Sequence, residues 1–261
     1  MNIKGGVAIV TGSATGIGAE TAKLLARKGC RVVVNYSRSR EEAEATAGEC
    51  RAAGVDVLVH QADIADDAQC RGMAAAAIER WGRIDALVNS AFQHGNFPEP
   101  VEAADLDVWR QVFDTNVFGT MTLTQEVAAL MKPQGGGAIV MINTQATRKP
   151  MPGESGYAAS KGALAVAVKY LARELGPHGI RANSIFMGWM WGAPVQGYVR
   201  HAAAEQGVGE DAIIAPVAAQ IALGRMPTDD DCARAALFLV SDYARAITGA
   251  SLDANGGDFM P

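Results

Sequence analysis

The sequence predicts an α/β protein whose core is a parallel β-sheet. Short apolar, β-branched runs alternate with helical patterns along most of the chain, which is typical of strands joined by right-handed helical crossovers. A glycine-rich turn follows the first of these runs. A segment near the middle, residues 144–161, combines a hydroxyl, a phenol and an amine.

The bulk properties indicate one domain, residues 1–261, with no internal join or repeat. A hydrophobic content of 49% with 29 glycines suits a packed α/β domain. The formal charge of −5 argues against nucleic acid or an anionic membrane as the main partner. No apolar run reaches the roughly 20 residues that span a bilayer, so no membrane segment is expected.

Further expectations concern location and metals. The chain passes from MNIKG directly into a strand, which leaves no room for a signal peptide. Its four cysteines are scattered, without a Cys-x-x-Cys pair, and are expected to be reduced packing residues of a cytoplasmic protein. The four histidines lack metal-ligand spacing, so no catalytic metal is expected.

The first strand is expected over residues 6–11 and the following helix over 18–29. Between them the sequence TGSATGIG places glycines at positions 12, 16 and 18. Glycines let the backbone turn tightly and approach a ligand, and the helix N-terminus offers free N–H groups and a positive dipole end. The spacing differs from G-x-G-x-x-G, but its position between strand and helix predicts a pyrophosphate site.

The second strand is expected over residues 31–36, before a helix over 39–54. Its end is where such folds recognise the adenosine ribose. An acidic residue there would repel a 2′-phosphate, whereas this chain has Ser37 and Arg38, with Arg40 close by. A cation and a hydroxyl favour NADP over NAD. Alternatively, Arg38 and Arg40 are solvated turn charges.

The third strand, residues 55–60, leads to Asp63 and Ile64 and then to a helix over 66–82. A fourth strand is expected over 84–91. One long helix is expected over 106–131, and it carries Asn116 within an apolar pattern. A buried amide is costly unless it is hydrogen-bonded, so either neighbouring backbone satisfies Asn116 or it reaches the active site through water.

The fifth strand, residues 138–143, ends next to Thr144, and a helix is expected from Tyr157 onward. Tyr157 and Lys161 are four positions apart, which places them on one face of that helix. A cation beside a phenol should lower the pKa of the phenol and create an acid/base that works near neutral pH. The hydroxyl of Thr144 could hold a carbonyl or carbinol oxygen.

The sixth strand and its turn are expected over residues 180–188. The apolar but irregular stretch over about 188–223 is interpreted as a substrate lid. A helix over 228–241 begins with TDDD, whose side chains suit a helix N-terminus. A seventh strand is expected over 250–257.

Taken together, these residues closely resemble the short-chain dehydrogenase/reductase family, and particularly its 3-oxoacyl-ACP-reductase-like members. The resemblance is carried by Thr11, Gly12, Gly16, Gly18, Asp63, Asn89, Asn116, Tyr157, Lys161, Asn183 and Gly188. It implies a single-domain Rossmann fold with a seven-stranded parallel sheet between two helix layers, usually assembled as a homotetramer. The reaction it implies is reversible hydride transfer between a nicotinamide and a small-molecule alcohol or carbonyl.

The resemblance also implies residue roles. Tyr157 would be the general acid/base, Lys161 would lower its pKa and hold the nicotinamide ribose, and Asn116 would support a proton-relay water. Thr144 stands where most members have serine and would polarise the substrate carbonyl. The cofactor contacts would be Gly12, Ser13, Thr15, Gly16, Ile17, Gly18, Tyr36, Ser37, Arg38, Asp63, Ile64, Asn89, Ser90, Ala91, Tyr157, Lys161, Met187 and Gly188.

The chain departs from the family pattern near the expected substrate. Asn-Asn-Ala-Gly becomes Asn89-Ser90-Ala91-Phe92, and Pro-Gly becomes Met187-Gly188. Thr15 stands where many NADP-preferring members have a basic residue, which weakens the NADP preference. Large side chains at the expected mouth predict a bulky or cyclic carbonyl substrate: Phe92, His94, Met187, Trp189, Met190 and Trp191. Several of these alternatively pack the lid, and a catalytic role for His94 stays open.

Two functions are consistent with the sequence. One is an NADP(H)-dependent carbonyl reductase or alcohol dehydrogenase, with NAD(H) as a possible cofactor. The other is a non-catalytic NADP(H)-binding redox sensor or scaffold. Sensors of this type typically lose the tyrosine or the lysine, and here both are present, which favours the enzyme.

Overall fold

A computed structural model describes residues 3–261. The strands are β1 (Val7–Val10), β2 (Arg31–Tyr36), β3 (Val57–Gln61), β4 (Ala86–Asn89), β5 (Gly137–Thr144), β6 (Ile180–Met187) and β7 (Ser251–Ala254). The α-helices are α1 (Gly16–Arg27), α2 (Arg40–Ala52), α3 (Asp67–Trp81), α4 (Leu106–Phe113), α5 (Thr120–Met131), α6 (Ser155–Leu175), α7 (Ala193–Gln206), α8 (Glu210–Ala218) and α9 (Asp229–Val240).

The strands form one parallel sheet in the order β3-β2-β1-β4-β5-β6-β7. The seven-stranded parallel sheet expected from the sequence is therefore confirmed. The strand order reverses between the adjacent strands β1 and β4, because the chain returns from β3 at one edge to place β4 beside β1. Ligands of such sheets bind beside the carboxyl ends of the strands at this reversal. Because all strands run in the same direction, the ends of β1, β4, β5 and β6 meet at one edge.

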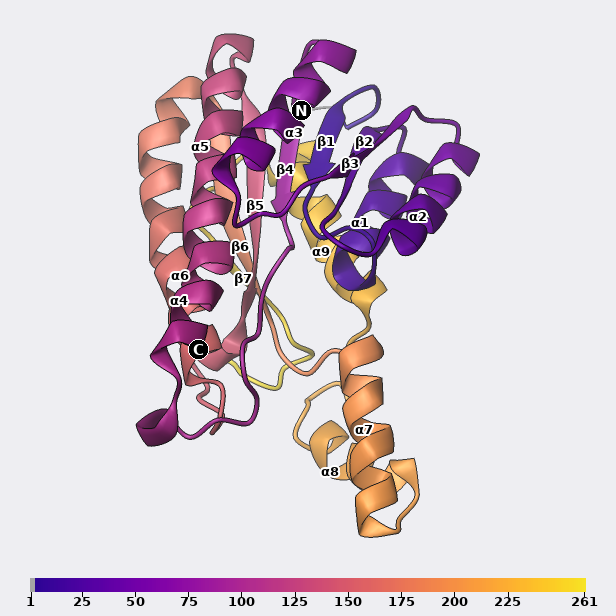
Figure 1. The fold of residues 1–261 in the computed structure, drawn as a ribbon. Helices are drawn as coiled ribbons and strands as arrows, with labels where there is room; N and C mark the ends of the chain where they lie inside the picture. Colours follow the sequence, from indigo (N-terminus) through magenta and orange to yellow (C-terminus); the bar gives the residue numbers. More distant parts are fainter. Residues whose placement is uncertain (1–2) are drawn as a thin grey trace.

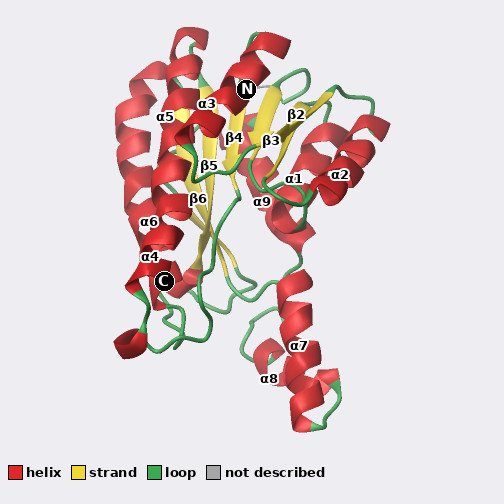
Figure 2. Cartoon of the chain, viewed as in Figure 1, coloured by secondary structure: helices red, strands yellow, loops and turns green. Residues whose placement is uncertain are grey.

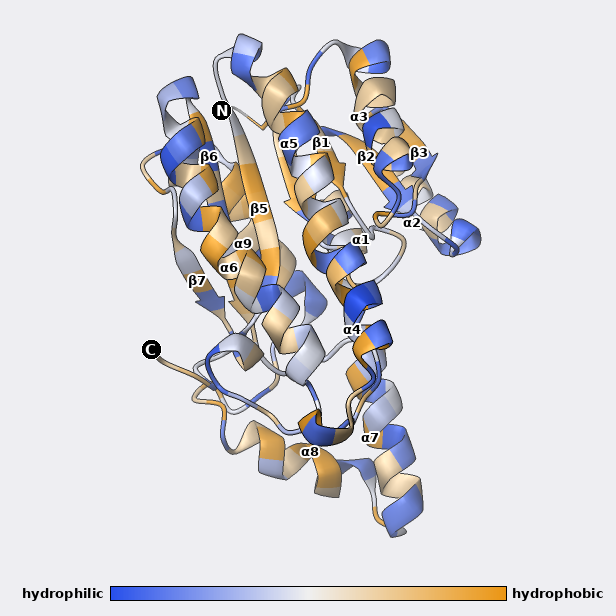
Figure 3. Cartoon of the chain, turned by 60° about the vertical axis from the view of Figure 1, so that its left-hand side comes forward, coloured by the Kyte–Doolittle hydropathy of each residue, from blue (hydrophilic) through white to orange (hydrophobic). Residues whose placement is uncertain are grey.

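Helices cover both faces of the sheet (Figure 1). One buried cluster joins alternate strand residues to α1, α2 and α9. A second cluster joins the opposite strand faces to α3, α5 and α6. Strands buried on both faces are apolar along most of their length, and β1 and the middle of β5 are accordingly orange in Figure 3. The strands lie between the two helix layers in Figure 2, which agrees with the expected Rossmann architecture.

The long helix expected over residues 106–131 is interrupted. A π-helical segment, Asp114–Gly119, separates α4 from α5. Short π-helical segments inside α-helices frequently occur at functional sites. It brings Gly119 so close to the end of β3 that an added Cβ would lie 1.7 Å from the Ile64 carbonyl oxygen. Hydrophobic periodicity could not predict this widened turn, because the apolar pattern continues through it.

The stretch expected to be a lid folds as two helices, α7 and α8. Figures 1 and 2 show both helices projecting beyond the sheet, at the end where the strands terminate. The lid is attached to the body by a backbone hydrogen bond from Trp191 N to Pro227 O of 2.7 Å. Its position is consistent with the expected role over a ligand.

Two further findings concern the described part of the chain. None of the helices within residues 3–261 has both the length and the apolarity that a membrane crossing needs. The four cysteines, Cys30, Cys50, Cys70 and Cys232, are all buried free thiols.

Candidate active site

Thr144, Tyr157 and Lys161 come together where β5 ends against α6. The Thr144 hydroxyl lies near enough to the Tyr157 phenol to lower its pKa by hydrogen bonding. Lys161, whose side chain is buried, donates from Nζ to the Ile142 carbonyl of β5 at 2.9 Å. The Lys161 ammonium also lies 5.9 Å from the centre of the Tyr157 ring. The structure therefore assembles the hydroxyl, phenol and amine that the sequence places in residues 144–161.

The electrostatics of this group differ from the sequence-based expectation. Burial raises the pKa of Tyr157, the Glu154 carboxylate raises it further, and the hydrogen bond from Thr144 opposes both. The pKa of Tyr157 is therefore raised, and the expected fall is wrong. Desolvation of the phenolate outweighs the effect of the nearby amine. Burial lowers the pKa of Lys161 to about 8, which leaves this amine able to change charge near neutral pH.

Asn116 lies in the π-helical segment, fully buried. Its Nδ2 donates to Gln93 O at 2.9 Å and to Ser160 Oγ at 3.0 Å, and its Oδ1 accepts from Gln93 N at 2.7 Å. The Asn116 amide is thus hydrogen-bonded by neighbouring groups, which was one of the two alternatives expected from the sequence. The bond to Ser160 places it one residue from Lys161, while a water bridged by Asn116 stays a prediction.

Three side chains surround the Tyr157 ring. His94 stacks on it with ring centres 4.6 Å apart, and Phe92 lies 5.9 Å away at a tilt. The carboxylate of Glu154 is 3.4 Å from His94 Nε2. Phe92 and His94, both expected near the substrate, do lie beside the phenol. Glu154 was not anticipated, although its position three residues before Tyr157 at the start of α6 could have pointed to it.

The tryptophans of the lid are placed differently. Trp189 packs near Tyr198 of α7, with ring centres 6.1 Å apart, and both Trp189 and Trp191 are partly buried. Met190, also expected at the substrate mouth, is instead buried in the hydrophobic core against the strands. These contacts support packing of the lid by part of this apolar set.

The glycine-rich turn has the shape that a phosphate group requires. An added Cβ would lie 2.8 Å from Ala91 Cα at Gly12 and 2.3 Å from Gly12 O at Gly18, so both positions need glycine for packing. Gly16 has φ +59°, a backbone conformation that favours glycine. Thr15 precedes α1 without capping it, and the first turn of α1 carries no acidic residue, which leaves its N–H groups for an anion.

Residues after β2 divide into buried and accessible groups. Tyr36 is buried in the core, so the expected cofactor contact cannot come from its ring; only its backbone is available. Ser37, Arg38 and Arg40 are exposed. Within residues 3–261 no ion pair involves Arg38, which leaves its guanidinium available to a ligand.

The expected cofactor residues after β3 and β4 are held by backbone and interior contacts. Asp63 accepts from Ala65 N at 3.0 Å and is exposed, whereas Ile64 is buried. Asn89 is buried and its Nδ2 donates to Thr124 Oγ1 at 3.1 Å, while its Oδ1 has no hydrogen-bond partner within residues 3–261. Thr11 Oγ1 accepts from the backbone N–H groups of Ser90 and Ala91, at 2.9 and 3.0 Å.

A polar network from the C-terminal segment supports the loop after Thr144. Gln145 and Lys149 both bond Asp258, the latter at 2.6 Å, and Arg148 pairs with Asp253 at the end of β7. A Cβ on Gly188 would lie 2.6 Å from Gln145 Oε1, which explains glycine after Met187. The sequence pattern offered no signal for this network, because its partners are far apart along the chain.

The site contains no recognisable metal centre. Across residues 3–261, no group of three His, Cys, Asp or Glu side chains is placed to hold an ion. What the arrangement provides is a phenol that can exchange a proton, a hydroxyl able to bond the same oxygen, and a buried amine nearby. A carbonyl or carbinol oxygen placed between Thr144 and Tyr157 would meet both hydroxyls.

Comparisons with known proteins agree with this geometry. A family model described as enoyl-(acyl carrier protein) reductase matches residues 12–258. An uncharacterized oxidoreductase of Methylorubrum extorquens is 37% identical, with 98% of each chain covered. The 3-oxoacyl-[acyl-carrier-protein] reductase FabG of Staphylococcus aureus is 33% identical, over 97% of this chain and 98% of that protein.

Solved structures show the same fold. NAD⁺-bound xylitol dehydrogenase superposes with a TM-score of 0.89 at 27% identity, covering 98% of this chain and all of that one. A short-chain type dehydrogenase/reductase of Mycobacterium ulcerans gives a TM-score of 0.88 at 26% identity, over 99% of this chain and 91% of that one.

Proposed function

Since the chain belongs to the short-chain dehydrogenase/reductase family and is an oxidoreductase of that type, we propose that it is an NADP(H)-dependent carbonyl reductase or alcohol dehydrogenase. The observation that carries this proposal is the assembly of Thr144, Tyr157 and Lys161 at the end of β5. A nicotinamide, when bound, supplies or accepts the hydride. A non-catalytic sensor would not need this assembly.

The residues divide the work on the substrate oxygen. Tyr157 gives its phenolic proton to the oxygen during reduction and takes it back during oxidation. Thr144, whose hydroxyl lies near that phenol, holds the same oxygen as negative charge develops on it. Lys161, with its pKa lowered to about 8 by burial, places a cation near the phenol and can pass a proton through the site.

The preference for NADP(H) is proposed from the end of β2. Ser37 and Arg38 are exposed there, and a guanidinium with a hydroxyl matches a 2′-phosphate. The only cofactor named among the relatives described above is the NAD⁺ of xylitol dehydrogenase, so NAD(H) is the alternative. The rest of the cofactor is proposed to contact the glycine-rich turn, Asp63, and the backbone of residues 89–91 and 187–188.

The proposed substrate is a bulky or cyclic ketone, or the matching alcohol. Phe92 is 53% exposed beside Tyr157, and so offers an apolar wall to a ligand. His94, stacked on the ring, and Glu154, 3.4 Å from His94 Nε2, add polar groups beside it. Trp189 and Trp191, proposed to complete the site from the lid, are only partly exposed.

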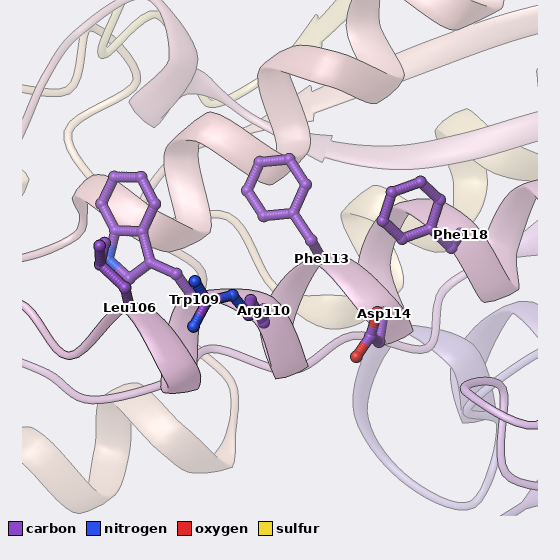
Figure 4. A pocket seen from close by; sticks show the side chains of 6 residues that line it. All are labelled: Leu106, Trp109, Arg110, Phe113, Asp114 and Phe118. Carbon is purple, nitrogen blue, oxygen red and sulfur yellow. The ribbon is translucent and has the colours of Figure 1, made fainter.

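We propose a homotetramer in the cytoplasm, as the resemblance implies. An apolar hollow of about 340 Å³ lies on α4 and the π-helical segment (Figure 4), lined by Leu106, Trp109, Arg110, Phe113, Asp114 and Phe118. Phe118 is 62% exposed, and Tyr170 of neighbouring α6 is 65% exposed. Such patches favour protein association.

Light scattering after size exclusion should give about four times the chain mass, and a monomer would contradict the proposal.

Removing the Thr144 hydroxyl should lower turnover. Thr144→Val keeps the shape, so kcat for ketone reduction should fall about 10²-fold, the low end for an oxyanion donor. Thr144→Ser should keep most activity because its hydroxyl persists. Tyr157→Phe, the positive control, should lose roughly 10²–10⁴-fold while still binding NADPH. Wild-type kcat in Thr144→Val would show that Thr144 only packs.

Removing the exposed guanidinium should affect one cofactor more than the other. Arg38→Ala should raise the KM for NADPH by a factor roughly ten or more times larger than the factor by which it raises the KM for NADH. The reason is that a charge-assisted bond to phosphate is worth about 1.5–3 kcal/mol. Arg40→Ala is the matched control two positions away. Equal effects of Arg38→Ala on both cofactors would mean that Arg38 is a solvated turn charge.

A further inference from the structure

The acidic run at the start of α9 contains one carboxylate that its neighbours do not use. Thr228 and Asp231 form a reciprocal capping box, and Asp231 also pairs with Arg225 at 2.7 Å. Asp230 pairs with Arg234 at 2.6 Å. Asp229 has no hydrogen bond or ion pair with any group in residues 3–261. Capping explains Asp231 and an ion pair explains Asp230, which leaves the Asp229 carboxylate unexplained.

The Asp229 carboxylate lies between the glycine-rich turn and the start of the lid. A Cβ on Gly192, the residue before α7, would be 2.8 and 2.9 Å from the two Asp229 oxygens. On the other side, a Cβ on Gly16 would be 3.9 Å from Asp229 Oδ2, the only atom within 4 Å of that point. The Asp229 carboxylate therefore lies against the backbone of Gly192 and near Gly16 of the turn proposed to bind the pyrophosphate.

The groups around Asp229 make its negative charge unfavourable. Burial raises its pKa, and Glu20 of α1 raises it further. Glu20 is itself paired with Lys23 at 3.2 Å. The charge of Asp229 in turn contributes to the raised pKa of the buried Cys232 thiol. The first turn of α7 adds no charged side chain, and within residues 3–261 no ion pair joins Asp229 to a cation.

We propose that Asp229 is a cofactor-site residue whose charge opposes the dinucleotide pyrophosphate, so that cofactor binding is linked to proton uptake. The inference rests on the proposed function, because it requires a nicotinamide dinucleotide at the turn of residues 12–18. The carboxylate must either stay charged beside a second anion or take up a proton. Glycine at position 192 leaves room for the carboxylate, because a side chain there would contact it.

The sign of the effect follows from this linkage. An ionised Asp229 repels the pyrophosphate, so affinity should fall as pH rises through the pKa of Asp229. Below that pKa the carboxyl is neutral and the repulsion disappears. Two unit charges about 4 Å apart in water-exposed surroundings change a binding constant by about three- to tenfold. The N–H groups of α1 still bind the phosphate, and Asp229 tunes how tightly.

The test measures binding without substrate. NADPH and NADH are titrated into wild type, Asp229→Asn and the matched control Asp230→Asn, from pH 5 to pH 8.5, by the change in nicotinamide fluorescence. Calorimetry in two buffers of different ionisation enthalpy counts the protons taken up on binding. Protons that the cofactor itself gains or loses contribute equally in all three proteins, so they cancel when the variants are compared. With NADH, whose pyrophosphate does not titrate between pH 5 and pH 8.5, the wild-type proton count needs no variant: proton uptake on binding supports the inference, and its absence overturns it even if Asp229→Asn folds poorly.

Asp229→Asn should bind both cofactors about three- to tenfold more tightly than wild type at pH 8, converge with wild type at low pH, and take up fewer protons. Asp230→Asn should match wild type. Unchanged or weaker binding by Asp229→Asn, or a proton count equal to that of wild type, would overturn the inference while the proposed function stands. Absence of dinucleotide binding in all three proteins would overturn both.

Discussion

The hydrogen bond from Lys161 to the Ile142 carbonyl is the contact on which the site depends. It joins α6 to β5 through a buried amine, and burying an amine without such a partner would be costly. With α6 fixed in this way, Tyr157 one turn earlier lies against Thr144 at the end of the same strand. The parallel sheet then brings the glycine-rich turn after β1 to the same edge, where a cofactor and a substrate can meet.

Much of this arrangement follows from local patterns in the sequence. The strands are short β-branched runs, so β2, β5 and β6 lie within a residue or two of their expected limits. Glycine at positions 12, 16 and 18 is explained by close backbone approach or a positive φ, as the turn required. Tyr157 and Lys161 share a helix face because four residues make about one helical turn, and no long-range knowledge was needed.

The remainder depends on contacts between distant segments, which periodicity does not encode. The π-helical turn that carries Asn116 continues the apolar pattern of its flanking helices. Met190 is apolar whether it lines a pocket or fills the core, and the structure places it in the core. The pKa of Tyr157 was expected to fall because Lys161 is near, but the sequence could not show how strongly burial and Glu154 act in the opposite direction.

The central claim is that Tyr157 is the acid/base and that its surroundings set its pKa. It is tested most directly by the pH dependence of kcat/KM for alcohol oxidation, which requires the phenolate, in wild type and in Glu154→Gln. Because Glu154 raises the pKa of Tyr157, removing its charge should move the apparent pKa to lower pH. Glu99→Gln, in the same small pocket, should leave it unchanged. An apparent pKa that is equal in wild type and Glu154→Gln would contradict the account.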